Sequence, residues 1–244
     1  MKICAAQTRP VKANIGKNIE HHLQLIEKAV AAEAALIIFP ELSLTGYEPA
    51  LATDLAIETD DSRLNIFQEK SNAGNIVIGI GAPTKTNDGI HISLIIFQPN
   101  CERRVYSKEF LHADELPFFI PGRGGPTITL ENKIIAFAIC YEISVPEHAG
   151  KAFKNGAGIY VASVAKSAAG MEKAGQSLAA IAAQYSMKVV ISNSVGYYDN
   201  FESAGGSAAW NNTGKLIANL NKTNEGLLFF DTDSYAVTIS ENLL

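Results

Sequence analysis

The sequence has few cysteines, and they form no motif. Its 244 residues contain three, Cys4, Cys101 and Cys140, with no Cys-x-x-Cys pair among them. An odd and widely spaced set of this kind predicts neither a disulfide framework nor a zinc site. We therefore expect the three cysteines to be reduced.

Long apolar runs are also missing, and so is a strong excess of one charge. No run approaches the roughly 20 apolar residues of a spanning helix, and the first residues lack the apolar segment of a signal peptide. The net charge of -5 gives no reason to expect nucleic acid or an anionic membrane as a partner. These absences predict a cytoplasmic protein that binds a small molecule.

What the sequence does contain is an alternation of strand and helix patterns in an ordinary globular composition, with 47% hydrophobic and 18% charged residues. This predicts an α/β fold in one domain over residues 1–244, with an inner layer of sheet covered by helices. We expect strands at residues 2–8, 36–41, 75–84, 90–99, 103–107, 134–139, 158–164, 188–195, 204–210, 216–220 and 226–231, and helices at residues 14–35, 62–72, 145–155 and 171–185.

Cys140 stands at the end of the clearest buried strand. Residues 134–139 are all apolar, which indicates a strand covered on both faces. Ser144, Pro146 and Glu147 then predict a capping box that opens a helix. A thiol in such a turn, at the carboxyl end of a strand, is exposed to ligands and close to a helix start. The alternative is a small buried hydrophobic residue, the usual state of a free cysteine.

Two other parts of the sequence carry charged residues that are candidates for a functional site. Glu41 follows the apolar run of residues 36–39, as Cys140 follows its own strand. Lys108 and Glu115 lie in a segment rich in aromatic and charged residues, which predicts a loop, and loops often carry functional groups. The alternatives are a solvated strand end for Glu41 and a surface ion pair for Lys108 with Glu115.

The five histidines have no obvious common role. His21 and His22 lie on the first predicted helix, where we expect them to be solvated. His91 falls in a strand and His148 follows the cysteine turn. His112 lies between Lys108 and Glu115 in the sequence. It either lines the substrate pocket or lies outside it.

Three segments stand in an order that resembles a known family. They are residues 39–47 (FPELSLTGY), residues 106–122 with Lys108 and Glu115, and residues 139–147 (ICYEISVPE), followed by GGS at residues 205–207 and NTGK at residues 212–215. Together they resemble the carbon–nitrogen hydrolase (nitrilase) superfamily over nearly the whole chain. The ordered combination carries the resemblance, since no single motif is decisive.

The resemblance implies a four-layer α-β-β-α sandwich, a homodimer or higher homo-oligomer, and a Glu-Lys-Glu-Cys catalytic set. Matched position by position, Glu41 resembles the general base, Lys108 the cation at the oxyanion, Glu115 the second glutamate and Cys140 the nucleophile. The chemistry asks for the same residue types, because a thiol needs a base and a tetrahedral adduct needs positive charge or N–H donors. The scheme calls for no metal and no organic cofactor.

The substrate is less well defined. We expect Tyr47, Tyr141, Glu142 and Lys166 to bind it, and residues 48–60, 118–125 and 197–203 to supply pocket walls. Residues 143–146 carry no arginine, although several amidase branches have one nearby for an anionic group, and Lys166 interrupts a segment of small residues. Lys166 either contacts substrate or lies on the surface.

The function predicted in this way is hydrolysis of a non-peptide carbon–nitrogen bond, in a small linear amide or N-carbamoyl compound, through a cysteine thioester. Nitrile hydrolysis or acyl transfer to an amine at the same site are enzymatic alternatives. A non-catalytic binding protein on this fold is the alternative from another class.

Overall fold

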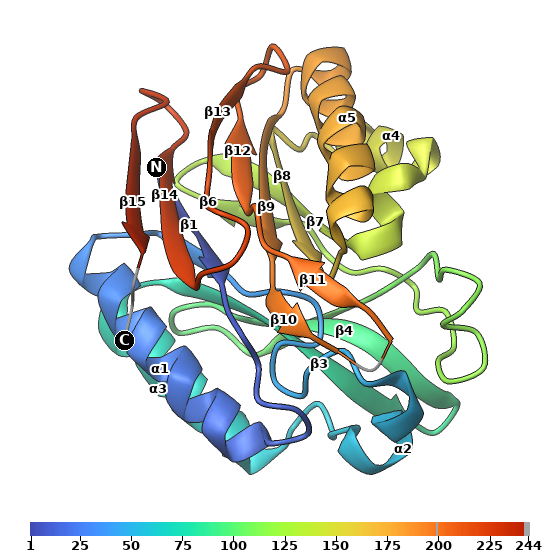
Figure 1. The fold of residues 1–244 in the computed structure, drawn as a ribbon. Coiled ribbons are helices and arrows are strands. Elements are labelled where there is room, and N and C mark those ends of the chain that lie inside the picture. The colour runs from blue at the N-terminus through green and yellow to red at the C-terminus, as the bar shows by residue number, and fades with distance from the viewer. Residues whose placement is uncertain (199, 242–244) are drawn as a thin grey trace.

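The computed structural model describes residues 1–198 and 200–241, and two large β-sheets dominate it (Figure 1). The seven-stranded sheet has the order β15 (Val237–Glu241), β14 (Gly226–Asp231), β1 (Lys2–Gln7), β2 (Leu36–Ile38), β3 (Val77–Thr86), β4 (Gly89–Phe97) and β5 (Arg104–Ser107). The six-stranded sheet has the order β13 (Leu216–Asn219), β12 (Ala208–Trp210), β9 (Lys188–Asn193), β8 (Ile159–Val164), β7 (Lys133–Ile139) and β6 (Ile128–Leu130). Strands β10 (Val195–Tyr197) and β11 (Glu202–Ala204) form a small separate hairpin.

The helices of the described residues are α1 (Ile15–Ala31), α2 (Ala52–Leu55), α3 (Asn65–Gly74), α4 (Pro146–Lys154) and α5 (Ala168–Tyr185), with 3-10 turns at Pro49–Leu51, Ser62–Leu64 and Cys140–Ser144. All of them except the short α2 cover the two outer faces. Figure 1 shows α1 with α3 on one side of the molecule and α4 with α5 on the other. No helix in the described part of the chain is long and apolar enough to cross a membrane.

Three apolar clusters hold the layers together. The central cluster lies between the sheets and includes Ile38 and Phe230 from one and Phe137 and Val161 from the other. A second cluster packs α1 and α3 against the seven-stranded sheet, and a third packs α4 and α5 against the six-stranded sheet. Strands β2 and β8 are buried at every residue because both of their faces are covered, which explains their unbroken apolar sequences. The fold is the four-layer α-β-β-α sandwich that the sequence predicts.

Several local expectations were wrong. Helix α4 begins at Pro146 with Val145 at its N-cap, and no side chain caps it, because Ser144 still belongs to the preceding 3-10 turn. The strand expected at residues 204–210 is broken, since Gly205 and Gly206 adopt left-handed φ angles of 53° and 73°. The sequence patterns also missed the short edge strands β6 and β15, whose residues are partly exposed.

One of the two histidines of α1 differs from expectation as well. His22 is buried, with its ring stacked on Phe39 at a centroid distance of 4.0 Å. Its Nδ1–H donates to the Asn18 carbonyl and its Nε2 accepts from Ser43 Oγ, at 2.6 Å and 2.9 Å. Burial lowers the pKa of His22 to about 3, so the ring is neutral. The expected solvated histidine instead joins α1 to the loop after β2.

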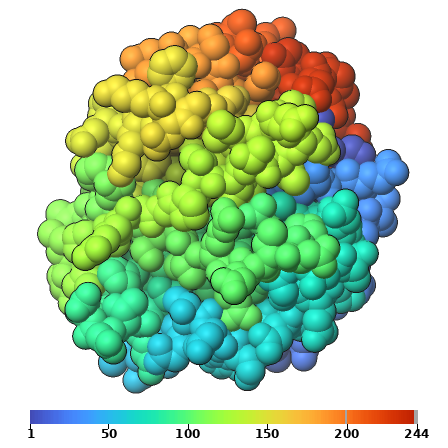
Figure 2. All heavy atoms as spheres, turned by 180° about the vertical axis from the view of Figure 1, so that it is seen from behind, coloured from blue at the N-terminus to red at the C-terminus, as the bar shows by residue number. Residues whose placement is uncertain are grey.

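The middle of the chain connects the two halves of the sandwich. Seen from behind, the green middle of the chain lies between the blue to cyan N-terminal part and the yellow to red C-terminal part (Figure 2). This segment includes β5, the loop after it and β6. The residues expected to be functional therefore approach one another from both sheets.

Candidate active site

Glu41 lies in the loop that follows β2, and the backbone around it is closely packed. Leu42 has a left-handed φ of 52°, which turns the chain back on itself directly after Glu41. A Cβ atom on Gly81 of β3 would lie only 2.4 Å from the Pro40 carbonyl oxygen, so only glycine allows this approach. The Glu41 side chain is thereby held inside the protein, with 1% of the residue exposed.

Lys108 follows β5 directly and points inward. Its backbone N–H donates to the Ile92 carbonyl at 2.8 Å, and its carbonyl accepts from Gly122 at 2.7 Å. The side chain is fully buried, and Nζ donates to Glu41 Oε1 at 2.8 Å and to Glu115 Oε1 at 2.6 Å. A buried lysine needs such partners, since an unpaired ammonium is strongly destabilising in a protein interior.

Glu115 closes this cluster from the loop after Lys108. Its Oε1 also accepts from the Tyr47 hydroxyl at 2.9 Å, and its Oε2 accepts from the His112 backbone N–H at 2.8 Å. Both oxygens of this carboxylate are therefore satisfied. By contrast, Glu41 Oε2 is buried and has no hydrogen-bond partner among the described residues, so it is free to accept a proton or a hydrogen bond.

Cys140 connects β7 to the 3-10 turn Cys140–Ser144. Its φ of 46° lies in the left-handed region, which is unusual for a residue with a side chain and marks a sharp elbow. Cys140 is a partly buried residue, and its sulfur lies 3.8 Å from the Ala165 carbonyl oxygen. Tyr141 is the second residue of the turn, so its N–H has no acceptor within that turn.

The charges of these groups affect one another. Burial, together with the Glu41 carboxylate, raises the pKa of the Cys140 thiol to about 11, although Lys166 and Lys108 act to lower it. Burial also raises the pKa of Glu41 above its usual range, opposed by Lys108. Burial acts to lower the pKa of Lys108, but the Glu41 carboxylate and the other anionic partners outweigh it, and the net pKa is raised. The ammonium therefore stays charged, and the thiol is neutral at pH 7.

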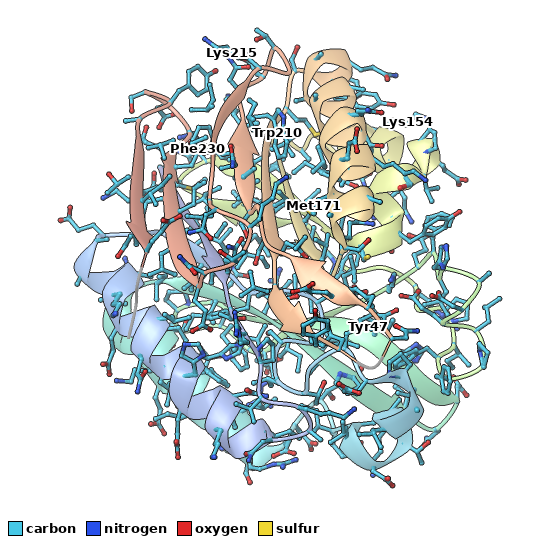
Figure 3. The ribbon with its side chains drawn as sticks, in the orientation of Figure 1. Tyr47, Lys154, Met171, Trp210, Lys215 and Phe230 are labelled. Atoms are coloured by element: carbon cyan, nitrogen blue, oxygen red, sulfur yellow. The ribbon has the colours of Figure 1, made fainter. Side chains whose placement is uncertain are left out.

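A pocket of about 450 Å³ opens onto these residues. Its lining residues are Tyr47, His112, Asp114, Glu115, Cys140, Tyr141, Ala165, Lys166, Ser167, Gly170, Asn200 and Phe201. Tyr47, labelled in Figure 3, lies beside the β10–β11 hairpin, and its ring meets that of Phe201 at 5.6 Å. This volume is typical of pockets that bind small molecules.

The structure brings most of the expected site residues to this pocket. Cys140 and Glu115 line it, as do three of the four expected substrate-binding residues, Tyr47, Tyr141 and Lys166. Glu41 and Lys108 lie behind the wall, in contact with each other and close enough to Cys140 to change its pKa. His112 also lines the pocket, and its Nδ1 lies 2.5 Å from Asp114 Oδ1.

Glu142 is the exception, because the structure places it away from the pocket where we expected it to bind substrate. Its residue is fully buried, it does not line the pocket, and its carboxylate accepts hydrogen bonds from protein groups behind the elbow. The tight 3-10 turn explains this, because it directs residue 142 away from the side on which Cys140 lies.

The walls also differ in part from expectation. Among residues 197–203, Asn200 and Phe201 line the pocket, while residue 199 lies outside the described residues. Residues 48–60 and 118–125 contribute no lining residue. The missed lining residues Ala165 and Ser167 follow β8, the parallel neighbour of β7, so the rule that ligands bind at strand ends was a signal for them. No cluster of metal-ligating side chains occurs in the described ranges.

Relatives of known function are similar to this chain. The glutamine-dependent NAD(+) synthetase of Acinetobacter baylyi is 32% identical over 126 residues, which are 50% of this chain and 23% of that protein. The match thus spans less than a quarter of the synthetase.

Solved structures of an amidase from Nesterenkonia sp. AN1 share the fold. One, a glutamate-to-glutamine variant with acrylamide added to the active-site cysteine, has a TM-score of 0.87 at 20% identity and covers 96% of this chain and 94% of that chain. Another, a cysteine-to-alanine variant in complex with butyramide, has a TM-score of 0.85 at 20% identity and covers 94% of this chain and 89% of that chain.

The family itself follows from the sequence match. The model of the family described as carbon-nitrogen hydrolase matches residues 2–239, nearly the whole chain. With the sandwich fold and a cysteine at the mouth of a pocket, this match shows that the chain belongs to the carbon–nitrogen hydrolase family, whose enzymes hydrolyse C–N bonds.

Proposed function

We propose that this protein hydrolyses a non-peptide carbon–nitrogen bond of a small linear amide or N-carbamoyl compound through a thioester on Cys140. The observation that carries the proposal is the buried Glu41–Lys108–Glu115 cluster next to a cysteine that lines a pocket. An ion pair that only stabilised the fold would need neither a second carboxylate nor a neighbouring cysteine. A carboxylate, an ammonium and a thiol placed together are the groups that nucleophilic attack on a carbonyl needs.

Glu41 is the proposed general base. Because burial raises the pKa of the Cys140 thiol to about 11, the thiol is neutral at pH 7, so its proton must be removed as the sulfur attacks. The unpartnered Glu41 Oε2 supplies an acceptor for that proton. The sulfur then forms a bond to the carbonyl carbon, and the electron pair of the C=O bond moves to oxygen.

Lys108 Nζ and the Tyr141 N–H are the proposed partners of the resulting oxyanion. Fixed donors in a site with little water stabilise developing charge strongly. When the adduct collapses, Glu41 returns its proton to the leaving nitrogen, and ammonia or an amine departs. Glu41 then takes a proton from a water molecule, whose oxygen attacks the thioester carbonyl carbon. The C–S bond breaks, the acid product departs, and Glu41 returns the proton to the sulfur, which regenerates the thiol.

The similar proteins suggest where to look for substrates. The Nesterenkonia amidase has been captured with acrylamide and with butyramide, both small linear amides. The Acinetobacter enzyme depends on glutamine, which also carries a terminal amide. A pocket of about 450 Å³ accommodates molecules of this size.

A panel assay tests the proposal. The purified protein is incubated with butyramide, acrylamide, glutamine, succinamate, an N-carbamoyl amino acid and a small nitrile, and ammonia release is measured. Release from amides or the carbamoyl compound supports hydrolysis of a C–N bond, whereas release from the nitrile alone supports nitrile hydrolysis. Amide consumption that requires an added amine indicates acyl transfer. Binding without turnover of any compound contradicts the proposal and favours a binding protein.

Glu41→Gln and Glu115→Gln should fail at different steps. The neutral amide introduced by Glu41→Gln cannot take the thiol proton, so we expect acylation to slow by about 10²–10⁴-fold, the usual contribution of a general base. Glu115 makes its contacts with Lys108, Tyr47 and the His112 backbone, so Glu115→Gln should still form the thioester, more slowly. Intact-mass measurement during turnover separates the two. Acylation of Glu41→Gln at the parent rate contradicts the choice of base.

Lys166 is proposed to contact the substrate. It lines the pocket, and its charge acts on the Cys140 thiol. Lys166→Met keeps the apolar stem and removes the charge. We expect the ratio of kcat/KM for succinamate to kcat/KM for butyramide to fall about tenfold, or ~1.4 kcal/mol.

The ratio of the two kcat/KM values reports how the variant affects recognition of the substrate's charge, separately from any effect on the nucleophile. Lys166 also lowers the pKa of the Cys140 thiol, so its loss should slow both substrates by a common factor that cancels in the ratio. Lys173→Met, on the exposed side of α5, is the matched control and should leave the ratio unchanged. An unchanged ratio in Lys166→Met places Lys166 outside substrate recognition.

The assembly of the protein also stays a prediction. A homodimer or larger homo-oligomer is expected from the family, and sedimentation at micromolar concentration measures it. A monomer there contradicts that expectation without bearing on the chemistry.

A further inference from the structure

The two halves of the proposed catalytic group come from different sheets. Lys108 follows β5 at the edge of the seven-stranded sheet, while Cys140 follows β7 of the six-stranded sheet. No ladder of backbone hydrogen bonds joins these two sheets in the described ranges. The distance between the ammonium and the sulfur therefore depends on side chains that span the gap.

The Glu142 carboxylate spans the gap between the two sheets. Its Oε1 accepts from the backbone N–H of Glu109 at 2.6 Å, and its Oε2 accepts from the backbone N–H of Ile139 at 2.7 Å. Glu109 is the residue after Lys108, and Ile139 is the residue before Cys140. One buried carboxylate thus joins the two backbone segments that carry the cation and the nucleophile.

A chain of buried hydrogen bonds ends on the same carboxylate. The Tyr106 hydroxyl donates to Glu142 Oε2 at 2.8 Å, and its oxygen also lies 2.7 Å from His148 Nε2. Because the single hydroxyl proton of Tyr106 is used, His148 Nε2 must carry a proton and donate to Tyr106. His148 Nδ1 lies 2.7 Å from the Tyr160 hydroxyl. Burial lowers the pKa of His148 to about 4, so the ring is neutral and Nδ1 accepts from Tyr160.

The contacts of Glu142 favour its ionised form. Each protein group within hydrogen-bond distance of its oxygens is a donor: three backbone N–H groups, of Glu109, Phe110 and Ile139, and the Tyr106 hydroxyl. Three of these four groups are N–H groups, which can only donate, so a carboxyl proton could be accepted only by the Tyr106 hydroxyl oxygen. Burial raises the pKa of Glu142, but these donors favour the ionised form. The arrangement fits a carboxylate.

We propose that Glu142 is a positioning residue, which sets the separation of Lys108 and Cys140 by binding the backbone on both sides of the gap. The inference rests on the proposed function. Its bond to Ile139 also holds the elbow in which Cys140 keeps a left-handed backbone angle, a conformation that relaxes without support. Tyr106 and His148 orient the carboxylate without contacting the pocket.

A pair of tyrosine variants tests this. Tyr106→Phe and Tyr160→Phe each remove one buried hydroxyl that bonds to His148, so both should lower the melting temperature by similar amounts. Only the Tyr106 hydroxyl touches Glu142. We expect Tyr106→Phe to reduce kcat about tenfold with little change in KM, and Tyr160→Phe to leave kcat within about twofold, since small displacements of catalytic groups lower the rate steeply.

A second readout does not depend on turnover. Iodoacetamide alkylates accessible thiols, and Cys101 is exposed, so its rate is an internal reference in every variant. The ratio of the Cys140 rate to the Cys101 rate, measured by peptide mass spectrometry, should fall about fivefold or more in Tyr106→Phe, because the thiol moves away from its base. It should be unchanged in Tyr160→Phe.

Glu142→Gln should have a larger effect. It replaces one carboxylate oxygen by an NH2 group, and this donor then faces another hydrogen-bond donor. We expect kcat to fall by about 10²-fold where the protein folds. If it does not fold, the tyrosine pair decides. Equal losses of kcat and of the alkylation ratio in the two tyrosine variants, or no loss in either, overturn the inference. A parent protein that turns over no amide refutes the proposed function, while the alkylation ratio still tests the positioning.

Discussion

Cys140→Ala should release no ammonia above background from any substrate that the parent turns over. The sulfur is the proposed nucleophile, and loss of the nucleophile in covalent hydrolases lowers kcat by on the order of 10⁶-fold. Because the residue is only partly buried and lies at the pocket, the variant should fold normally and still bind amides. Ammonia release and intact mass, which reports the missing thioester, check the result.

The other two cysteines are the controls. Cys4 is buried in β1, so Cys4→Ala avoids placing an unpaired hydroxyl in the core, and Cys101 is exposed and tolerates Cys101→Ser. Both variants should keep kcat within about tenfold, or ~1.4 kcal/mol in the barrier. Sustained turnover by Cys140→Ala contradicts the covalent mechanism altogether.

Lys108→Met should damage both activity and stability. Its ammonium is the only charged partner between the buried carboxylates of Glu41 and Glu115 in the described structure, and its removal leaves two like charges without compensation. Breaking a buried pair in this way costs about 3–5 kcal/mol of unfolding free energy. Loss of one oxyanion stabiliser lowers kcat by about 10²–10³-fold in addition. Denaturant unfolding and steady-state kinetics measure the two effects separately.

Lys85→Met provides the matched control. Lys85 also pairs with a glutamate, at 3.2 Å from Glu58, but both side chains are more than half exposed. Exposed pairs of this kind contribute about 0–1 kcal/mol, so unfolding and kcat should change little. If Lys108→Met is no more harmful than Lys85→Met, the ammonium has neither the structural nor the catalytic role assigned to it.

Much of this site was predictable, because its residues stand at places that local sequence marks. Cys140 follows an unbroken apolar run, and Glu41 follows another. A strand covered on both faces needs an apolar residue at every position, so the run and its end are visible without any knowledge of the fold. Strand ends in such sheets face ligand crevices, which is why the two residues were candidates before the structure placed them.

Other features left no local mark. His22 lies on an amphipathic helix, and a single polar residue there gives no sign that Ser43 and Phe39 will surround it. Glu142 stands beside the nucleophile in sequence, which suggested a contact with substrate, but the 3-10 turn directs it behind the elbow. Two of the hydrogen bonds to its carboxylate come from residues 33 and 36 positions away.

The sequence by itself determined the family, most of the longer strands and the residue types of the proposed catalytic group. These depend on hydrophobic period and on residue identity, which are properties of single segments. Tertiary structure alone decided which charges became buried partners, which loops line the pocket and which carboxylate joins the two sheets. Such contacts unite segments distant in sequence, and their energies depend on burial and on donor geometry, which no segment carries alone.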